Sequence, residues 1–453
     1  MESAEERLSF HHGSRDIFRL MLPCVVELIL GQFVSMVDMM MVSGLGTQAI
    51  NAVSIASEPL LMLYLVITAL NVGTTALISR AKGEGDMKKA NEIARHAQIF
   101  NLVVGLAMGI LGFALADLLI GMMGSPNPET AAIATVYLRY RILSVPAAAI
   151  GQANNGILRG MGNARSPMLY NICNNVVNIL FNWLLIHGIW IFPEMGVAGA
   201  ALATSIANVS SSVLSTSLLI HGLNGIKIPI REKFILNRDI LSNITKIGFP
   251  SMLEQAVFRL GLILFARITI SLGEVDYAAH ALCWNVMNMV MLFGNGMQMT
   301  TAPLTGQNAG RGDIRRAESY NKYAFWILVA LLSVCAGLTA LLGRPILMLY
   351  SPKEDVLAAA LPLLYLCCAY LPIAAFQYVY AGALAGAGDT KFNAPIMIIS
   401  IICIRLPLAY LFKDVLGWGL TGVNIALMID TFMRAALFYI RYKTGKWKTV
   451  KLK

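Results

Sequence analysis

Charged residues are scarce in this chain. Only 13% of its 453 residues are Asp, Glu, Lys or Arg, whereas about 25% is usual for a soluble domain. Hydrophobic residues account for 57% of the sequence. This composition excludes an ordinary soluble globular protein and predicts an integral membrane protein.

Patterns for enzymatic chemistry and for cofactors are also absent. Gly83-x-Gly85 and Gly386-x-Gly388 lack the Lys-Ser/Thr of a phosphate-binding loop. The sequence contains no His-Glu-x-x-His or Gly-x-Ser-x-Gly, and its six histidines and seven cysteines lack metal-ligand spacing. We therefore expect no enzymatic activity, no nucleotide and no cofactor. The net charge of +10 lies in short clusters between apolar runs, so we expect no nucleic-acid partner.

Long apolar runs dominate what is present. Only helices and closed barrels satisfy the backbone in lipid, and runs this long and uniformly apolar are typical of helices. We therefore predict an all-α membrane protein with twelve transmembrane helices. The runs cover approximately 17–44, 50–79, 93–123, 131–158, 167–189, 196–222, 240–272, 277–307, 320–350, 356–384, 393–414 and 419–441.

Lysine and arginine collect in the loops on one side of these spans, and the opposite loops hold only Arg344, Lys353 and Lys413. By the positive-inside rule, both termini and the loop between the sixth and seventh spans are cytoplasmic. We expect a multi-pass protein of the inner (plasma) membrane. The predicted segments are a cytoplasmic start (1–16), a six-helix bundle (17–222), a cytoplasmic linker (223–240), a second bundle (241–442) and a basic tail (443–453).

The two halves of the chain repeat each other. Gly83-Glu84-Gly85-Asp86 recurs in the second half as Gly310-Arg311-Gly312-Asp313, and Pro23 followed by Glu27 recurs at the same offset as Pro250 followed by Glu254. Because each half has an even number of spans, the copies share one orientation, and the pseudo-two-fold axis runs along the membrane normal. Transporters built this way bind substrate between their halves and expose it alternately to each side.

Asp38 places a carboxylate inside the first apolar run. An acidic side chain at this depth costs about 2.5–3.5 kcal/mol on insertion scales, which makes Asp38 a functional candidate. The fifth run supplies amide partners, because Asn174, Asn178 and Asn182 are spaced by four and share one helical face. Such a group suits proton or cation coupling, and Asp38 with Asn178 would ligate the ion if it is Na⁺. The alternative for the asparagines is interhelical hydrogen bonding.

These landmarks resemble the multidrug and toxic compound extrusion (MATE) family. The resemblance rests on Gly31-Gln32 followed by Asp38, on the two Gly-x-Gly-Asp loops, on Gly386-Ala387-Gly388-Asp389 and on Gly196-Val197-Ala198-Gly199. It implies two bundles that export amphipathic, often cationic compounds in exchange for inward H⁺ or Na⁺, with the lipid bilayer as the other partner. We expect a monomer. The alternative is a flippase for lipids or lipid-linked saccharides in the same superfamily.

The resemblance also carries residue roles. Asn178 and Asn182 match polar positions that line the cavity of the first-span acid in family members. Some members have a second acidic pair, but its positions are Phe258 and Ala374 here, so we expect coupling in the amino-terminal half. The choice between Na⁺ and H⁺ stays open. Pro23 is a candidate for coupling Asp38 to the shape of the cavity, with a static kink as the alternative.

Further polar residues lie within the predicted spans. Glu27, Glu254 and Gln377 are candidates for the substrate cavity, and the alternative for the two acids is pairing with intramembrane arginines. Asp430 and Arg434 have the i,i+4 spacing, which favours a structural ion pair. Arg139 and Arg141 are expected to extend toward the outer interface.

Overall fold

The computed structural model describes residues 10–124, 127–228, 234–350 and 352–450. These residues form helices and their connections, and the only bridge among them joins Leu223 and Ile226. The predicted all-α fold is confirmed. Residues 1–9 of the predicted start, 229–233 of the linker and 451–453 of the tail lie outside the described residues.

The helices follow one another with short connections. The first part of the chain forms α1 (Phe10–Ser43), α2 (Thr47–Glu84), α3 (Met87–Ala114), α4 (Ala116–Met123), α5 (Pro128–Ile142), α6 (Val145–Gly160), α7 (Arg165–His187) and α8 (Gly196–His221). The second part forms α9 (Arg238–Ile270), α10 (Glu274–Gly310), α11 (Ile314–Leu341), α12 (Gly343–Met348), α13 (Glu354–Tyr370), η1 (Leu371–Ile373), α14 (Ala374–Ala387), α15 (Asn393–Met397), η2 (Ile398–Arg405), α16 (Leu406–Tyr410), η3 (Leu411–Val415), α17 (Gly419–Lys443) and η4 (Lys446–Thr449).

These helices group into two compact units. The amino-terminal unit comprises Val26–Phe249, and the carboxyl-terminal unit comprises Met1–Val25 together with Pro250–Leu452. The division therefore falls inside α1, shortly after Pro23, and inside α9, directly before Pro250. The bundle limits expected from the sequence, 17–222 and 241–442, stay a prediction.

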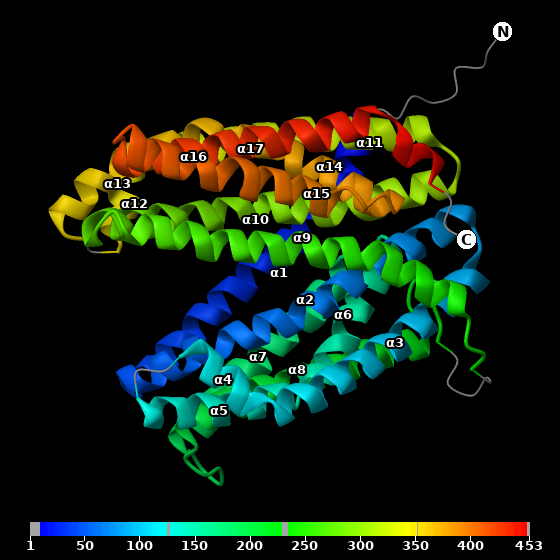
Figure 1. The fold of residues 1–453 in the computed structure, drawn as a ribbon. Coiled ribbons are helices and arrows are strands. Elements are labelled where there is room, and N and C mark those ends of the chain that lie inside the picture. The colour runs from blue at the N-terminus through cyan, green and yellow to red at the C-terminus, as the bar shows by residue number, and fades with distance from the viewer. Residues whose placement is uncertain (1–9, 125–126, 229–233, 351, 451–453) are drawn as a thin grey trace. The chain divides into compact units, whose positions relative to one another are not determined.

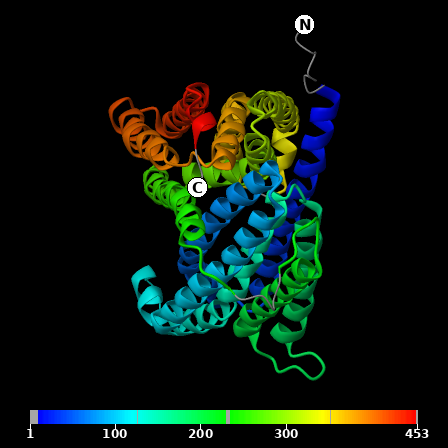
Figure 2. The ribbon, with the colours of Figure 1, turned by 90° about the vertical axis from the view of Figure 1, so that its right-hand side faces the viewer.

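Each unit is held together by long helices that pack along one another. In the amino-terminal unit, α7 packs against α8, and α3 packs against α6. In the carboxyl-terminal unit, α14 lies beside both α10 and α17 (Figures 1 and 2). The backbone hydrogen bonds are satisfied within the helices, so the helix exteriors can remain apolar.

The same turn builds corresponding corners of the two units. Gly85 (φ 76°) ends α2 in the left-handed conformation, and the Asp86 side chain then accepts from the backbone N–H of Lys89 at 2.9 Å. Gly312 (φ 77°) precedes Asp313, whose side chain accepts from the backbone N–H of Arg316 at 2.9 Å. The repeated Gly-Asp sequence is thus a left-handed glycine followed by a helix N-cap.

Two helical segments are less regular than the apolar pattern predicts. The segment expected at 131–158 is divided into α5 and α6, whose axes differ by 48°. The segment from Asn393 to Val415 contains two π-helical stretches, η2 and η3, whereas its counterpart α7 is regular. Both departures occur next to prolines and polar side chains, which disturb the regular hydrogen-bond ladder.

By length and composition, nine helices in the described ranges are apolar enough to cross a membrane, or ten if the bent α5–α6 pair forms one span. Two of the expected segments, which correspond to α9 and α10, fall outside this set. The total of twelve spans therefore stays a prediction.

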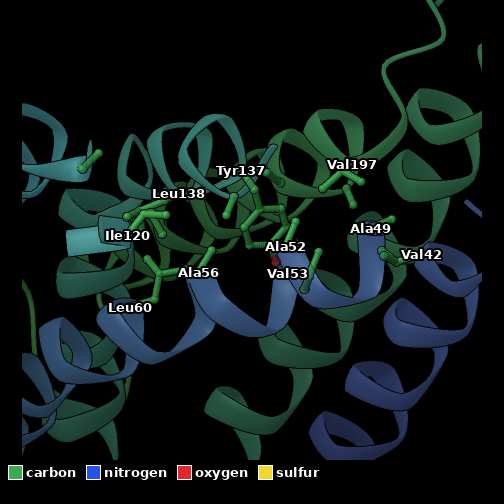
Figure 3. Close-up of a cluster of buried hydrophobic side chains, with 14 of the residues drawn as sticks. Val42, Ala49, Ala52, Val53, Ala56, Leu60, Ile120, Tyr137, Leu138 and Val197 are labelled. Carbon is green, nitrogen blue, oxygen red and sulfur yellow. The ribbon is translucent and has the colours of Figure 1, made fainter. Parts of the chain in front are cut away.

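The amino-terminal unit has a continuous apolar core at one end of α2. Figure 3 shows Ala52, Val53 and Ala56 of α2 facing Tyr137 and Leu138 of α5. Small alanines on α2 allow the neighbouring helix to approach closely. This packing fixes the position of α5, which carries Arg141.

The contact between α2 and α6 gives a test of this packing. A Cβ atom on the buried Gly156 would meet the Asn71 side chain and lie 3.1 Å from the Thr75 hydroxyl oxygen, whereas Gly151 on the same helix has nothing within 4 Å. We expect Gly156→Ala to lower the free energy of unfolding by about 1–3 kcal/mol because of overpacking. Denaturation in detergent micelles measures this change. Gly151→Ala is the control, and an equal loss in both variants would contradict the assigned packing.

Candidate functional site

A pocket of about 330 Å³ lies within the amino-terminal unit. It contains Asp38 among side chains from α1, α2, α5, α7 and α8. The residues that line it are Ser35, Asp38, Met39, Val42, Val53, Ser57, Leu60, Leu61, Tyr64, Tyr137, Arg141, Asn182, Ala200 and Thr204. The intramembrane acid therefore faces a cavity rather than lipid alone.

Two amides of α7 meet the Asp38 carboxylate. Asn182 donates from Nδ2 to Asp38 Oδ1 at 2.6 Å. With its amide oxygen accepting from the Thr204 hydroxyl at 3.0 Å, Asn178 donates to Asp38 Oδ1 at 2.8 Å and to Oδ2 at 3.2 Å. This orientation satisfies both ends of the Asn178 amide and gives the ionised carboxylate two donors.

Asn174 was predicted to share one helical face with Asn178 and Asn182, but its contacts differ from theirs. Its amide oxygen is buried without a hydrogen-bond partner among the described residues. The structure thus brings Asp38, Asn178 and Asn182 into one hydrogen-bonded group and does not link Asn174 to it. The coupling role of all four residues stays a prediction.

Arg141 is a pocket residue that the sequence placed elsewhere. Instead of extending toward the outer interface, it lines the cavity and is hydrogen-bonded to Tyr137. Its Nε and Nη1 atoms are buried without a hydrogen-bond partner among the described residues. Arg139, two positions earlier, pairs with Asp117 at 2.7 Å on an exposed surface. The two side chains point to different sides of α5, because two residues along a helix correspond to a rotation of about 200°.

The two glutamates related by the repeat have different surroundings. Glu27 accepts from Arg159 Nη2 at 2.6 and 2.8 Å and from Asn171 Nδ2 at 2.9 Å. Glu254 is buried and accepts from Asn393 Nδ2 at 2.8 Å. Glu27 therefore has an arginine partner, although the sequence pattern placed that arginine in a loop, and Glu254 has an amide partner.

The remaining candidates lie in the carboxyl-terminal unit. Gln377 is half-buried on α14, and Pro23 is buried in α1, which continues past it as one helix. Their roles in the cavity and in conformational change stay predictions.

The carboxyl-terminal unit has a buried charge cluster around Asp430. Asp430 is fully buried and accepts from Arg405 Nε at 2.8 Å, from Arg434 Nη2 at 2.9 Å and from the Ser400 hydroxyl. The predicted Asp430–Arg434 ion pair is present. Arg405 and Ser400 join it, and the sequence spacing did not indicate them.

The internal repeat relates one member of this cluster to the pocket. At the offset of 227 residues that relates Pro23 to Pro250 and Gly83 to Gly310, Asp38 corresponds to Phe265 and Asn178 corresponds to Arg405. The Arg405 guanidinium lies 5.7 Å from the centroid of the Phe265 ring. The pair that corresponds to the carboxylate and its amide is therefore an aromatic ring and a guanidinium. The carboxyl-terminal unit therefore has no carboxylate and no amide at these two positions.

Comparison with known sequences identifies the family. A sequence model of the MatE family matches residues 23–184 and matches residues 250–411 a second time. The chain belongs to the MatE family. The two matches begin at Pro23 and Pro250, the prolines of the internal repeat, so the repeat and the resemblance to MATE transporters are confirmed. The chain is accordingly a multi-pass membrane protein.

Similar proteins cover nearly the whole chain. It is 27% identical to the uncharacterized transporter YisQ of Bacillus subtilis (strain 168), over 95% of this chain and 94% of that protein. It is 26% identical to the probable multidrug resistance protein NorM of Thermotoga maritima, over 96% and 93%. It is 23% identical to the FAD transporter of Shewanella oneidensis, over 94% of each.

Solved structures show the same fold. One is described as the outward-facing conformation of a multidrug resistance MATE family transporter of the MOP superfamily (TM-score 0.89, 24% identity, 97% of each chain). Another is a MOP superfamily transporter from Pyrococcus furiosus, for which reverse polarity of the binding pocket suggests a different function (TM-score 0.88, 23% identity, 97% of each chain). The fold that the chain shares with these structures agrees with the predicted two-repeat architecture.

The buried charge cluster yields a test of stability. Asp430→Asn removes the single negative charge between Arg405 and Arg434 and leaves two buried guanidinium groups without a counter-ion. We expect the free energy of unfolding to fall by about 3–5 kcal/mol. Glu354→Gln is the control, because the Glu354 side chain is 79% exposed in its pair with Arg344 and its loss should cost about 0–1 kcal/mol. Denaturant titration of both variants in micelles makes the comparison, and equal stability of the two would contradict it.

Proposed function

We propose that this protein is a secondary antiporter that exports amphipathic, often cationic drugs or toxic organic compounds in exchange for inward H⁺ or Na⁺. The observation that carries the proposal is the contact of Asp38 with Asn178 and Asn182 inside a pocket. A carboxylate that faces a cavity can bind H⁺ or Na⁺ from one side of the membrane. It can release that ion to the other side when the cavity opens there. The names of relatives such as NorM support export of drugs.

Exchange follows from competition for one negative charge. A proton or Na⁺ on Asp38 neutralises the carboxylate, and a cationic substrate requires the ionised form. Binding of one therefore opposes binding of the other, which is the condition for antiport by alternating access. A membrane potential supplies about 2.3 kcal/mol per charge per 100 mV for inward movement of the ion.

The amide orientations bear on the choice of ion. Asn182 and Asn178 present N–H donors to ionised Asp38. Protonation of Asp38 turns one oxygen into a donor, and rotation of one amide supplies an acceptor. Na⁺ requires oxygen ligands, so both amides would have to rotate to serve it. Proton coupling thus needs the smaller rearrangement, and both ions remain within the proposal.

We further propose a monomer in the plasma membrane with both termini in the cytoplasm. The excess of lysine and arginine on one side of the predicted spans supports this orientation. Glu27, Glu254 and Gln377 are proposed cavity residues, with Glu27 held by Arg159. A lipid or saccharide flippase is not favoured, because the relatives include several multidrug resistance proteins.

The proposal is tested by ethidium efflux from proteoliposomes under separately imposed Na⁺ and pH gradients. We expect one gradient to drive transport and Asp38→Asn to reduce the driven rate to the background of empty liposomes. The asparagine retains the size of the side chain but cannot exchange a proton or balance a cation.

Asp117→Asn serves as the control, because Asp117 is an exposed carboxylate in an ion pair on α4. Thermal unfolding verifies that both variants are folded. Gradient-driven efflux by Asp38→Asn at the wild-type rate would contradict the coupling role. Failure of both gradients to drive efflux would contradict antiport of this dye.

A further inference from the structure

His96, in the first third of α3, is hydrogen-bonded through both ring nitrogens to the backbone. The residue is buried, with 2% of its surface exposed. Nδ1 lies 2.8 Å from the carbonyl oxygen of Glu92, and Nε2 lies 2.8 Å from the backbone nitrogen of Asn237. A carbonyl oxygen only accepts and a backbone N–H only donates, so Nδ1 carries the proton and Nε2 is the acceptor. His96 is therefore held as the neutral Nδ1–H tautomer.

The partner of Nε2 belongs to the linker between the two predicted bundles. Asn237 directly precedes α9 and caps it, because its side-chain oxygen accepts from the backbone N–H two residues later at 3.1 Å. Its Nδ2 donates to the Glu92 carboxylate at 3.0 Å. Three positions earlier, the centroid of the Phe234 ring lies 4.7 Å from that of the His96 ring. Residues 234–237, which we call the linker end, are thus docked on α3 around this imidazole.

The same pair of positions makes a contact in the other unit. At the offset of 227 residues, Asn237 corresponds to Phe10 and His96 corresponds to Tyr323. The rings of Phe10 and Tyr323 pack edge to face, with their centroids 5.2 Å apart. In both units, the beginning of a long helix is therefore held by a ring on α3 or on its counterpart α11. In the amino-terminal unit that ring is an imidazole, which changes its charge between about pH 5 and 8.

Two charged side chains of α3 lie beside this contact. The Glu92 carboxylate accepts from the linker end, and the Arg95 guanidinium lies 5.3 Å from the centroid of the aromatic ring of the linker end. Glu92 favours a positive charge on His96, and Arg95 opposes it. The next two residues of the chain, Arg238 and Asp239, are exposed and carry opposite charges. The charges around the imidazole are therefore mixed in sign.

The helices packed against α3 carry charges that have partners of their own. On α2, Arg80 pairs with Glu84 at 3.4 Å, and on α6, Arg159 pairs with Glu27 at 2.6 Å. Within the described ranges, no ion pair joins a carboxylate to His96. The hydrogen bonds to the backbone therefore decide which form of the ring is compatible with docking.

We propose that His96 is a pH-sensitive latch for the linker. The neutral imidazole holds the linker end on α3, and protonation releases it, because Nε2–H would then face the N–H of Asn237 and both groups would be donors. Docking requires the neutral ring, so the docked state weakens as the pH falls. Lysine and arginine collect on this side of the predicted spans, so the latch responds to the pH of the proposed cytoplasmic side. The proposal does not depend on antiport and is separate from the chemistry of Asp38.

Hydrogen–deuterium exchange at the Asn237 amide tests the latch, because this N–H donates to His96. The full chain in micelles is followed from about pH 7.5 to about pH 5.5, and each rate is compared with that of an unprotected amide at the same pH. We expect the protection of Asn237 to fall toward low pH by up to about tenfold per pH unit, as release linked to one proton requires. The Lys227 amide donates to Asn91 Oδ1 at 3.0 Å, an acceptor that does not titrate, so its protection should stay constant.

Three variants separate a titrating latch from a contact that only supports the fold. His96→Gln retains an acceptor near the position of Nε2 but does not titrate, so Asn237 should stay protected over the whole range. His96→Phe keeps a ring against Phe234 and has no acceptor, so protection should be low at every pH. His221→Gln is the matched control, because His221 is an exposed histidine at the end of α8. Its pH profile at Asn237 should equal that of the wild type.

A wild-type protein in which the protection of Asn237 does not change with pH would overturn the proposal, whether or not the variants fold. An unchanged pH profile in His96→Gln would overturn it as well. An equal loss of protection at Lys227 would also overturn it, because the whole region would then open together. Thermal unfolding verifies that each variant is folded.

Discussion

The hydrogen bonds between Asp38 and the amides of α7 are the interaction around which the amino-terminal unit is arranged. A carboxylate in an apolar helix is tolerated only where polar partners reach it, and the partners here come from a helix distant in the sequence. Their contact requires α1, α7 and α8 to lie together, because Thr204 of α8 orients the amide of Asn178. The same arrangement leaves the cavity between these helices, α2 and α5. The polar group and the cavity are therefore consequences of one packing.

The two units share one fold but surround their buried acids with different partners. Matching Gly-Asp turns fix corresponding corners, and the family match repeats at the offset that relates these turns. Inside this common frame, the amino-terminal unit holds an acid with neutral donors. The carboxyl-terminal unit holds Asp430 of α17 between Arg434 of the same helix and Arg405 of the π-helical stretch η2. The extra residue in a π turn shifts side chains around the helix axis, which accompanies the placement of Ser400 and Arg405 on the same buried carboxylate.

Much of the fold and part of the candidate site could be predicted from the sequence. Apolar length predicts the helices, the repeat predicts the two-fold architecture, and the i,i+4 spacing of Asn178 and Asn182 places them on one face toward a single acid. Partners from distant helices were harder to predict. The sequence places Arg159 in a loop and Arg141 near the outer interface, yet Arg159 reaches Glu27 and Arg141 lines the pocket. Long side chains extend over a helical turn, and the bend after α5 lies next to Pro146, which the apolar pattern alone does not mark as a break. The Arg405–Asp430 contact likewise depends on η2, which apolar periodicity does not reveal.

The pairing of Phe265 with Arg405 limits how the carboxyl-terminal unit could acquire a second carboxylate with amide partners by mutation. Replacing Phe265 by aspartate alone would place a carboxylate near the Arg405 guanidinium, which lies 5.7 Å from the centroid of the Phe265 ring. Replacing Arg405 by asparagine alone would leave Asp430 paired with Arg434 and no free acid at the vacated place. Neither single replacement therefore yields a carboxylate with two neutral amide donors, the arrangement found at Asp38. The asymmetry between the halves persists through either point mutation.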